Sequence, residues 1–195
     1  MKNIIFYITI YLGLLYICCS SPISFLFAED FRLPDTGQTA CYDSEKQLQQ
    51  CPIEESASFY GQDAHYVGPQ PAYQEHSEQT LYDLNTKLLW VKSDDGIQKN
   101  WNDAVSYCNE LTQSGYSDWR LPSRFELLSI TNYGKYAPAI NTSVFPHCFS
   151  EGYWTITPSA IQSEYVWYVD FESGKAERIH KKNMYYVRCV RSAVP

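Results

Sequence analysis

The sequence predicts an α+β fold in which two short helices precede most of the strands. Three observations predict it. Residues 101–111 repeat apolar side chains at helical spacing, and residues 123–126 have the spacing of a helix capping box. From residue 153 onward, short runs rich in Tyr, Trp and Val alternate with turn residues, as antiparallel strands do. Because helices and strands are segregated along the chain, a wound parallel sheet is disfavoured.

The first 28 residues have the composition of a secretory signal peptide. A short positive start is followed by an almost wholly apolar run over residues 4–19. We expect cleavage after Ala28, which leaves no stable membrane span and places the protein in the periplasm, at the cell surface or in the medium. Two alternatives stay open: an uncleaved membrane anchor, and lipidation of Cys18 or Cys19, which the neighbouring residues disfavour.

An acidic, irregular extension is predicted for residues 29–79. Residues 29–80 carry ten acidic and two basic residues, whereas residues 81–195 carry twelve of each. The extension shows no helical or strand period, and we expect Cys41 and Cys51 to close a small disulfide loop in it. The formal net charge of the whole chain is −7, which argues against nucleic acid as a partner.

The main domain is predicted for residues 80–195 and begins with a β-hairpin. Its two strands lie near residues 81–82 and 88–91, on either side of a turn. Asn100 can then cap a helix whose apolar residues share one face. We expect Gly115 to end this first helix.

A second short helix is predicted from Ser123 through Ile130. The Ser123 hydroxyl and the Glu126 carboxylate have the spacing of a reciprocal cap. In the last predicted strand, a period of two places Val187 and Cys189 inward. The four strands predicted after this helix are 153–156, 165–171, 176–180 and 185–191.

Export would place the remaining five cysteines in an oxidising compartment, where disulfides are expected. Cys108 lies on the inward face of the first helix and Cys189 on the inward face of the last strand. We therefore expect these two residues to form a disulfide, which would stabilise the fold by about 4–5 kcal/mol. Cys148 is then an unpaired thiol or links to another chain.

A series of motifs occurs in order along the main domain. It consists of Trp101-Asn102-Asp103-Ala104 with Tyr107-Cys108, Gly115-Tyr116-Ser117-Asp118-Trp119-Arg120-Leu121-Pro122, Glu126-Leu127-Leu128-Ser129-Ile130, Tyr153-Trp154-Thr155, Trp167-Tyr168-Val169-Asp170-Phe171 and Val187-Arg188-Cys189-Val190-Arg191. Over about residues 80–192 this series resembles the Lcl C-terminal domain family, named for the Legionella collagen-like adhesin.

The resemblance implies a C-type-lectin-like fold, in which two helices flank small antiparallel sheets and a disulfide joins the first helix to the last strand. The best-known member of the family is similar to a surface adhesin that binds sulfated polysaccharides as a trimer. The resemblance therefore implies an adhesive function, although fold alone does not determine function.

Positive charge is concentrated in residues 175–191, which hold six basic residues and one Glu. Such a stretch can bind a sulfated or carboxylated glycan. It can equally be a solvated hairpin whose basic side chains pair with the acidic extension, and the sequence leaves both interpretations open. The basic residues that we consider as ligand contacts are Lys175, Arg178, Lys181, Lys182 and Arg188.

Trp119 is a further candidate, because its ring could stack on a sugar. The favoured interpretation of residues 118–122 is a structural corner, in which Arg120 holds a carboxylate or carbonyl groups between the helices.

A lectin-type calcium site is not expected. Asn102 and Asp103 spell part of a calcium motif with Trp101, but they lie at a helix start, where the helix dipole favours them. Catalytic motifs and metal-ligand spacings are missing from the sequence. We therefore expect no enzyme activity, cofactor or metal.

Two functions follow from these observations. The first is an exported, non-catalytic binding module that recognises glycan or another cell-surface ligand, as an adhesin does. The alternative is a structural or assembly component of a cell-envelope complex that binds protein partners. Either function is compatible with a homo-oligomer.

Overall fold

A computed structural model describes residues 32–193, so the predicted signal peptide at 1–28 lies outside the described residues. No helix in the described part is long and apolar enough to cross a membrane. The elements follow one another as η1 (Asp63–His65), β1 (Tyr73–Glu75), β2 (Thr80–Asp83), β3 (Leu88–Val91), α1 (Trp101–Glu110), α2 (Arg124–Leu128), β4 (Gly152–Pro158), β5 (Tyr165–Asp170), β6 (Lys175–His180) and β7 (Val190–Ser192).

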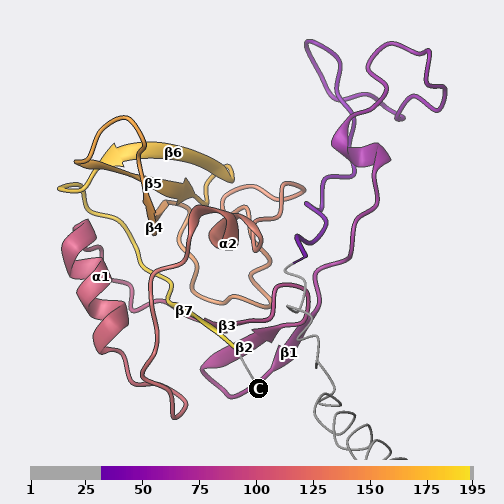
Figure 1. Cartoon of the computed structure of the whole chain (residues 1–195). Coiled ribbons are helices and arrows are strands. Elements are labelled where there is room, and N and C mark those ends of the chain that lie inside the picture. Colours follow the sequence, from indigo (N-terminus) through magenta and orange to yellow (C-terminus); the bar gives the residue numbers. More distant parts are fainter. Residues whose placement is uncertain (1–31, 194–195) are drawn as a thin grey trace, which may run out of the picture. The chain divides into compact units, whose positions relative to one another are not determined.

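The strands form two antiparallel sheets (Figure 1). The first sheet has the order β1-β2-β3-β7 and the second the order β4-β5-β6. Leu127 of α2 packs in one core cluster with Leu88 of β3 and Val169 of β5, so this helix lies between the sheets. The two helices, the small sheets and the disulfides confirm the predicted α+β, C-type-lectin-like fold.

Strand β3 lies at the centre of the core, because both of its faces are buried. Leu88 and Trp90 belong to one hydrophobic cluster, whereas Leu89 and Val91 belong to a second one. This division follows from the alternation of side chains along a strand. The hairpin turn after β2 is fixed by the Asp83 carboxylate, which accepts backbone hydrogen bonds from the turn.

Both helices begin where their caps predict. The Asn100 side chain accepts a hydrogen bond from the backbone N–H of Asp103 at the start of α1. At the start of α2, Ser123 and Glu126 form the complete capping box. Helix α1 ends at Glu110, earlier than expected from Gly115.

Both predicted disulfides are present. Cys41 pairs with Cys51, and Cys108 pairs with Cys189. Cys108 and Cys189 are 0% and 2% exposed, so this second disulfide lies inside the core. Cys148 is the free cysteine of the described residues.

Two predictions of strands are wrong in part. The extension contributes β1, whose Tyr73 pairs with Asp83 of β2, although three residues are too few to show a period. The strand predicted over 185–191 is reduced to β7, because the preceding residues cross between the sheets. Tyr186 accepts a hydrogen bond from the backbone N–H of Trp154, whereas the carbonyl of Cys189 accepts one from Val91.

The extension docks on the loop that follows α2. The Thr36 carbonyl accepts a hydrogen bond of 2.8 Å from the backbone N–H of Tyr133. The Asp35 carboxylate accepts backbone hydrogen bonds from Gly37 and Gly68, and these bonds lower the pKa of its carboxyl group. Among residues 32–193, no ion pair joins the acidic extension to the basic side chains of 175–182.

Candidate ligand-binding surface

The β5–β6 hairpin separates the candidate basic residues onto two faces. Trp167 lies opposite Arg178 in the ladder, and Asp170 lies opposite Lys175. Because side chains alternate along a strand, Lys175 and Arg178 point to opposite faces of this sheet. The predicted basic stretch is therefore not one continuous patch.

Two guanidinium groups converge on the ring of Trp167. The Arg124 guanidinium, from the first turn of α2, lies 4.2 Å from the ring centroid. The Arg178 guanidinium, from β6, lies 5.7 Å from the same centroid. Phe125 is 58% exposed, and its ring lies 4.7 Å from the Arg124 guanidinium. We call these four residues the Trp167 face.

The Trp167 face is fixed by the backbone of its surroundings. The backbone N–H of Arg124 donates a hydrogen bond of 2.8 Å to the Thr157 hydroxyl of β4. Along the same face of the hairpin, the rings of Tyr165 and His180 meet edge to face at 5.4 Å. The sheet therefore presents aromatic rings beside two planar cations, an arrangement that holds guanidinium groups in place.

The two lysines after β6 occupy a different position. The Lys181 ammonium lies 4.8 Å from the ring centroid of Trp101, at the start of α1. Its backbone carbonyl accepts a hydrogen bond from the backbone N–H of Trp101. Lys182 is exposed in the following turn. These lysines do not belong to the Trp167 face.

Trp119 is not available as a stacking platform, because it is 2% exposed. Its indole N–H lies 3.2 Å from the Tyr116 carbonyl, to which it donates. The ring packs in the cluster that contains Leu121 and the disulfide cysteine Cys189. The prediction of a stacking platform is wrong because burying this large apolar ring in the core stabilises the fold.

Residues 118–122 form the structural corner that was favoured from sequence. Arg120 binds Glu126 through two parallel hydrogen bonds of 2.9 and 2.7 Å. Asp118 accepts 2.7 and 3.1 Å hydrogen bonds from Arg191, and these bonds lower the pKa of its carboxyl group. The corner thereby connects α2 with β7 through charge-assisted bonds.

The Glu126 carboxylate is expected to make the stability of the fold depend on pH. Burial would raise the pKa of this group, but hydrogen bonds from Arg120 and Ser123 outweigh burial and lower it. Because the pKa of Glu126 is lower in the folded state than in the unfolded state, where it is about 4.3, the carboxylate stabilises the fold above about pH 4.3. This stabilisation is lost as the pH falls through the pKa of the folded state. We expect Glu126→Gln to cost about 1–3 kcal/mol in urea unfolding at pH 7 and less at pH 3. An equal loss at both pH values would contradict this assignment.

Arg188, which was predicted as a ligand contact, lies inside the core. Its side chain is 0% exposed, so it cannot contact an external ligand. The guanidinium lies 3.6 Å from the Asp94 carboxylate, whose side chain is also 0% exposed. It donates hydrogen bonds to the carbonyls of Val91 and Lys92. The alternation of side chains does not expose Arg188, because this segment lies between two core clusters and neither of its faces meets solvent.

Cys148 lies beside this buried group. Burial raises the pKa of its thiol, and the nearby Arg188 and Tyr153 lower it by less. A raised pKa leaves little thiolate at neutral pH, which makes this thiol a weak nucleophile.

The family model of the Lcl C-terminal domain matches residues 79–191, which is more than half of the chain. The chain belongs to the Lcl C-terminal domain family. No curated protein matches the chain. The Lcl C-terminal domain includes every residue of the Trp167 face, and the family is consistent with a non-catalytic module. The disulfides fit an exported protein.

Sequence reasoning missed three members of the Trp167 face in this Lcl C-terminal domain. Arg124 and Phe125 directly follow the cap residue Ser123, a position from which side chains tend to point away from the core. Trp167 alternates with buried Val166, which places it on the other side of β5. These local signals existed, but their convergence depends on how α2 docks against β5.

Proposed function

We propose that the protein is an exported, non-catalytic module that binds an anionic glycan at the Trp167 face. The observation that carries this proposal is the state of its two arginines. Arg124 and Arg178 have no carboxylate partner among the described residues, although both guanidinium groups are held beside Trp167.

The other arginines of the matched domain provide the contrast. Arg120, Arg188 and Arg191 are each paired with a carboxylate inside the fold. Such arginines serve the structure, since their charge is already compensated. A guanidinium without a carboxylate partner can bind a sulfate or carboxylate group through its accessible donors. In Arg124 these exclude the buried Nε.

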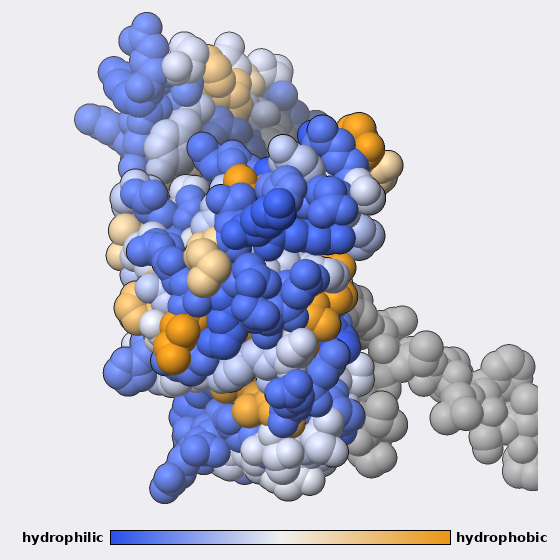
Figure 2. Space-filling model, turned by 90° about the vertical axis from the view of Figure 1, so that its left-hand side faces the viewer, coloured by the Kyte–Doolittle hydropathy of each residue, from blue (hydrophilic) through white to orange (hydrophobic). Residues whose placement is uncertain are grey.

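One side of the molecule is mostly polar. On the side of the molecule shown in Figure 2, hydrophilic residues cover most of the surface and hydrophobic residues form small separate groups. Stable protein interfaces usually have a continuous apolar centre. The resemblance to an adhesin that binds sulfated polysaccharides supports the same choice over an assembly function.

We expect Arg124→Ala combined with Arg178→Ala to weaken binding to heparin, a sulfated polysaccharide probe, by about tenfold or more. The reason is the loss of two oriented cations from one site. Binding of the unaltered protein should weaken as salt rises, because the interaction is between charges. Surface plasmon resonance at two salt concentrations measures both effects.

The matched control is Lys46→Ala combined with Lys135→Ala, which removes the same charge from two exposed positions outside the Trp167 face. This control should bind heparin nearly as well as the unaltered protein. A second pair, Lys181→Ala with Lys182→Ala, tests the other basic position. Equal losses in all three variants would contradict a defined site. Heparin binding that is absent in the unaltered protein, with envelope proteins co-purifying, would favour the assembly function.

A further inference from the structure

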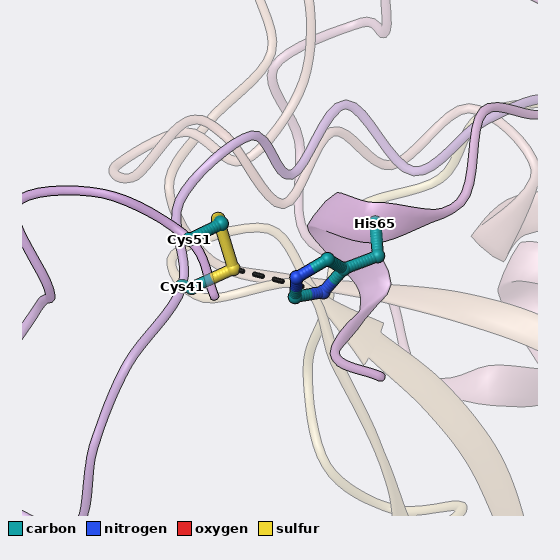
Figure 3. A group of neighbouring side chains, drawn as sticks. All are labelled: Cys41, Cys51 and His65. Atoms are coloured by element: carbon teal, nitrogen blue, oxygen red, sulfur yellow. Dashed lines mark hydrogen bonds between the residues drawn. A yellow bond between two sulfur atoms is a disulfide. The ribbon is translucent and has the colours of Figure 1, made fainter. Parts of the chain in front are cut away.

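The disulfide of the extension lies against a histidine. Cys41, Cys51 and His65 come together in the lobe formed by residues 41–66, and their ligand atoms all lie within 4.8 Å of one another (Figure 3). The Cys41 sulfur is 3.9 Å from Nδ1 of His65. This group lies in the extension, and the proposed glycan site does not use it.

The imidazole of His65 is held in a defined orientation. Its Nε2 lies 2.6 Å from the Pro52 carbonyl, which can only accept, so Nε2 carries a proton and donates. The Tyr60 ring packs against the imidazole at 4.7 Å. Nδ1 lies 3.9 Å from the Cys41 sulfur and also 3.2 Å from the Gln62 carbonyl, so a cation bound at Nδ1 would replace the hydrogen bond to Gln62. At metal-binding histidines a backbone carbonyl commonly accepts from one ring nitrogen and so orients the ring, as the Pro52 carbonyl does here.

We propose that reduction of the Cys41–Cys51 disulfide opens a zinc site. The two thiolates and Nδ1 of His65 would bind one Zn²⁺, and water would occupy the fourth position of the tetrahedron. Thiolate sulfur and imidazole nitrogen are the donors that Zn²⁺ prefers, and hard cations such as Mg²⁺ are poorly suited to them.

The distances are compatible with this coordination. Zn–S bonds of about 2.3 Å and Zn–N bonds of about 2.1 Å place sulfur and nitrogen about 3.6 Å apart in a tetrahedral site. The observed separation of 3.9 Å between Cys41 and His65 is close to this value. The two sulfurs must move apart once their bond is broken. The residues between them are mostly exposed and irregular, so the loop can follow.

The reductant in this proposal is a dithiol. Its first thiolate attacks the half-exposed Cys51 sulfur and releases Cys41, which is 1% exposed, as a thiolate beside His65. Its second thiol then displaces Cys51, so the dithiol becomes a cyclic disulfide and has supplied two electrons and two protons. Zn²⁺ replaces the two thiol protons, which pass to solvent. The Cys108–Cys189 disulfide is protected by burial and remains oxidised.

The test uses the full chain with Cys18→Ser, Cys19→Ser and Cys148→Ser, so that both disulfides supply all remaining cysteines. An immobilised dithiol reduces the protein without oxygen, and thiol alkylation with mass spectrometry identifies the cysteines that were opened. Titration with Co²⁺ then reports coordination, because thiolate-to-cobalt charge transfer absorbs in the near ultraviolet. We expect one Co²⁺ per reduced chain, displacement by Zn²⁺, and no such absorption in the oxidised protein.

His65→Ala should weaken the binding of Co²⁺ by about tenfold or more, in line with losses seen at metal sites. The matched control is His76→Ala, which removes a histidine that lies outside residues 41–66 and bonds to Thr80, and this variant should bind Co²⁺ normally. Circular dichroism checks that each variant is folded. The proposal is overturned if the reduced protein shows no charge-transfer band, or if His65→Ala binds Co²⁺ as tightly as its parent.

Discussion

Replacing Cys108 and Cys189 by alanine is expected to lower the free energy of unfolding of the domain by about 4 kcal/mol. The disulfide links residues that are 81 positions apart, so it restricts most of the unfolded domain. It also joins α1 to the segment that leads into β7, inside the second hydrophobic cluster. Urea unfolding followed by tryptophan fluorescence measures the loss.

The matched control is the pair Cys41→Ala and Cys51→Ala, which removes a disulfide that spans only 10 positions. Its loss in the chain-entropy treatment is about 3 kcal/mol at most. We expect a smaller effect on the fluorescence transition, because the tryptophans of the described core lie in the main domain. A larger loss from the Cys41–Cys51 pair than from the Cys108–Cys189 pair would contradict this explanation.

The features of the fold that were predictable depend on neighbours in sequence. A cap such as Asn100 or the Ser123–Glu126 box is recognisable because its partners lie within one helical turn. The Cys108–Cys189 disulfide was predictable for a related reason. The helical period placed Cys108 on an inward face, and the strand period did the same for Cys189. In all these cases the physical signal is contained in a single element.

The features that were not predictable depend on how elements meet. Arg188 was predicted to lie on a solvent-exposed face, because the alternation of side chains along a strand was taken to leave one face in solvent. The segment instead passes between two core clusters, so both sides are buried. Similarly, Arg124 and Trp167 are distant in sequence, and only the docking of α2 on β5 brings them together. Of the basic residues considered from sequence, Arg178 is the one that lies beside Trp167.

Asp94→Asn is expected to lower the free energy of unfolding by about 3–5 kcal/mol. The substitution removes the charge that compensates the buried guanidinium of Arg188, while the size of the side chain is kept. Nε and Nη2 of Arg188 have no hydrogen-bond partner among the described residues, so this guanidinium depends on the Asp94 carboxylate. The Tyr153 hydroxyl, which donates to Asp94, would keep an acceptor in the new amide.

The decisive measurement is a double-mutant cycle with Arg188→Met. This single change leaves the Asp94 carboxylate buried and also frees the carbonyls of Val91 and Lys92, so we expect a loss of about 3–5 kcal/mol. The variant with both substitutions buries no charge and should lose clearly less than the sum of the single losses, with a coupling of about 1–3 kcal/mol in urea unfolding. Additive losses would mean that the two groups do not compensate each other. A strong coupling would show that Asp94 compensates the buried charge of Arg188, which accounts for an arginine of the basic stretch lying inside the core.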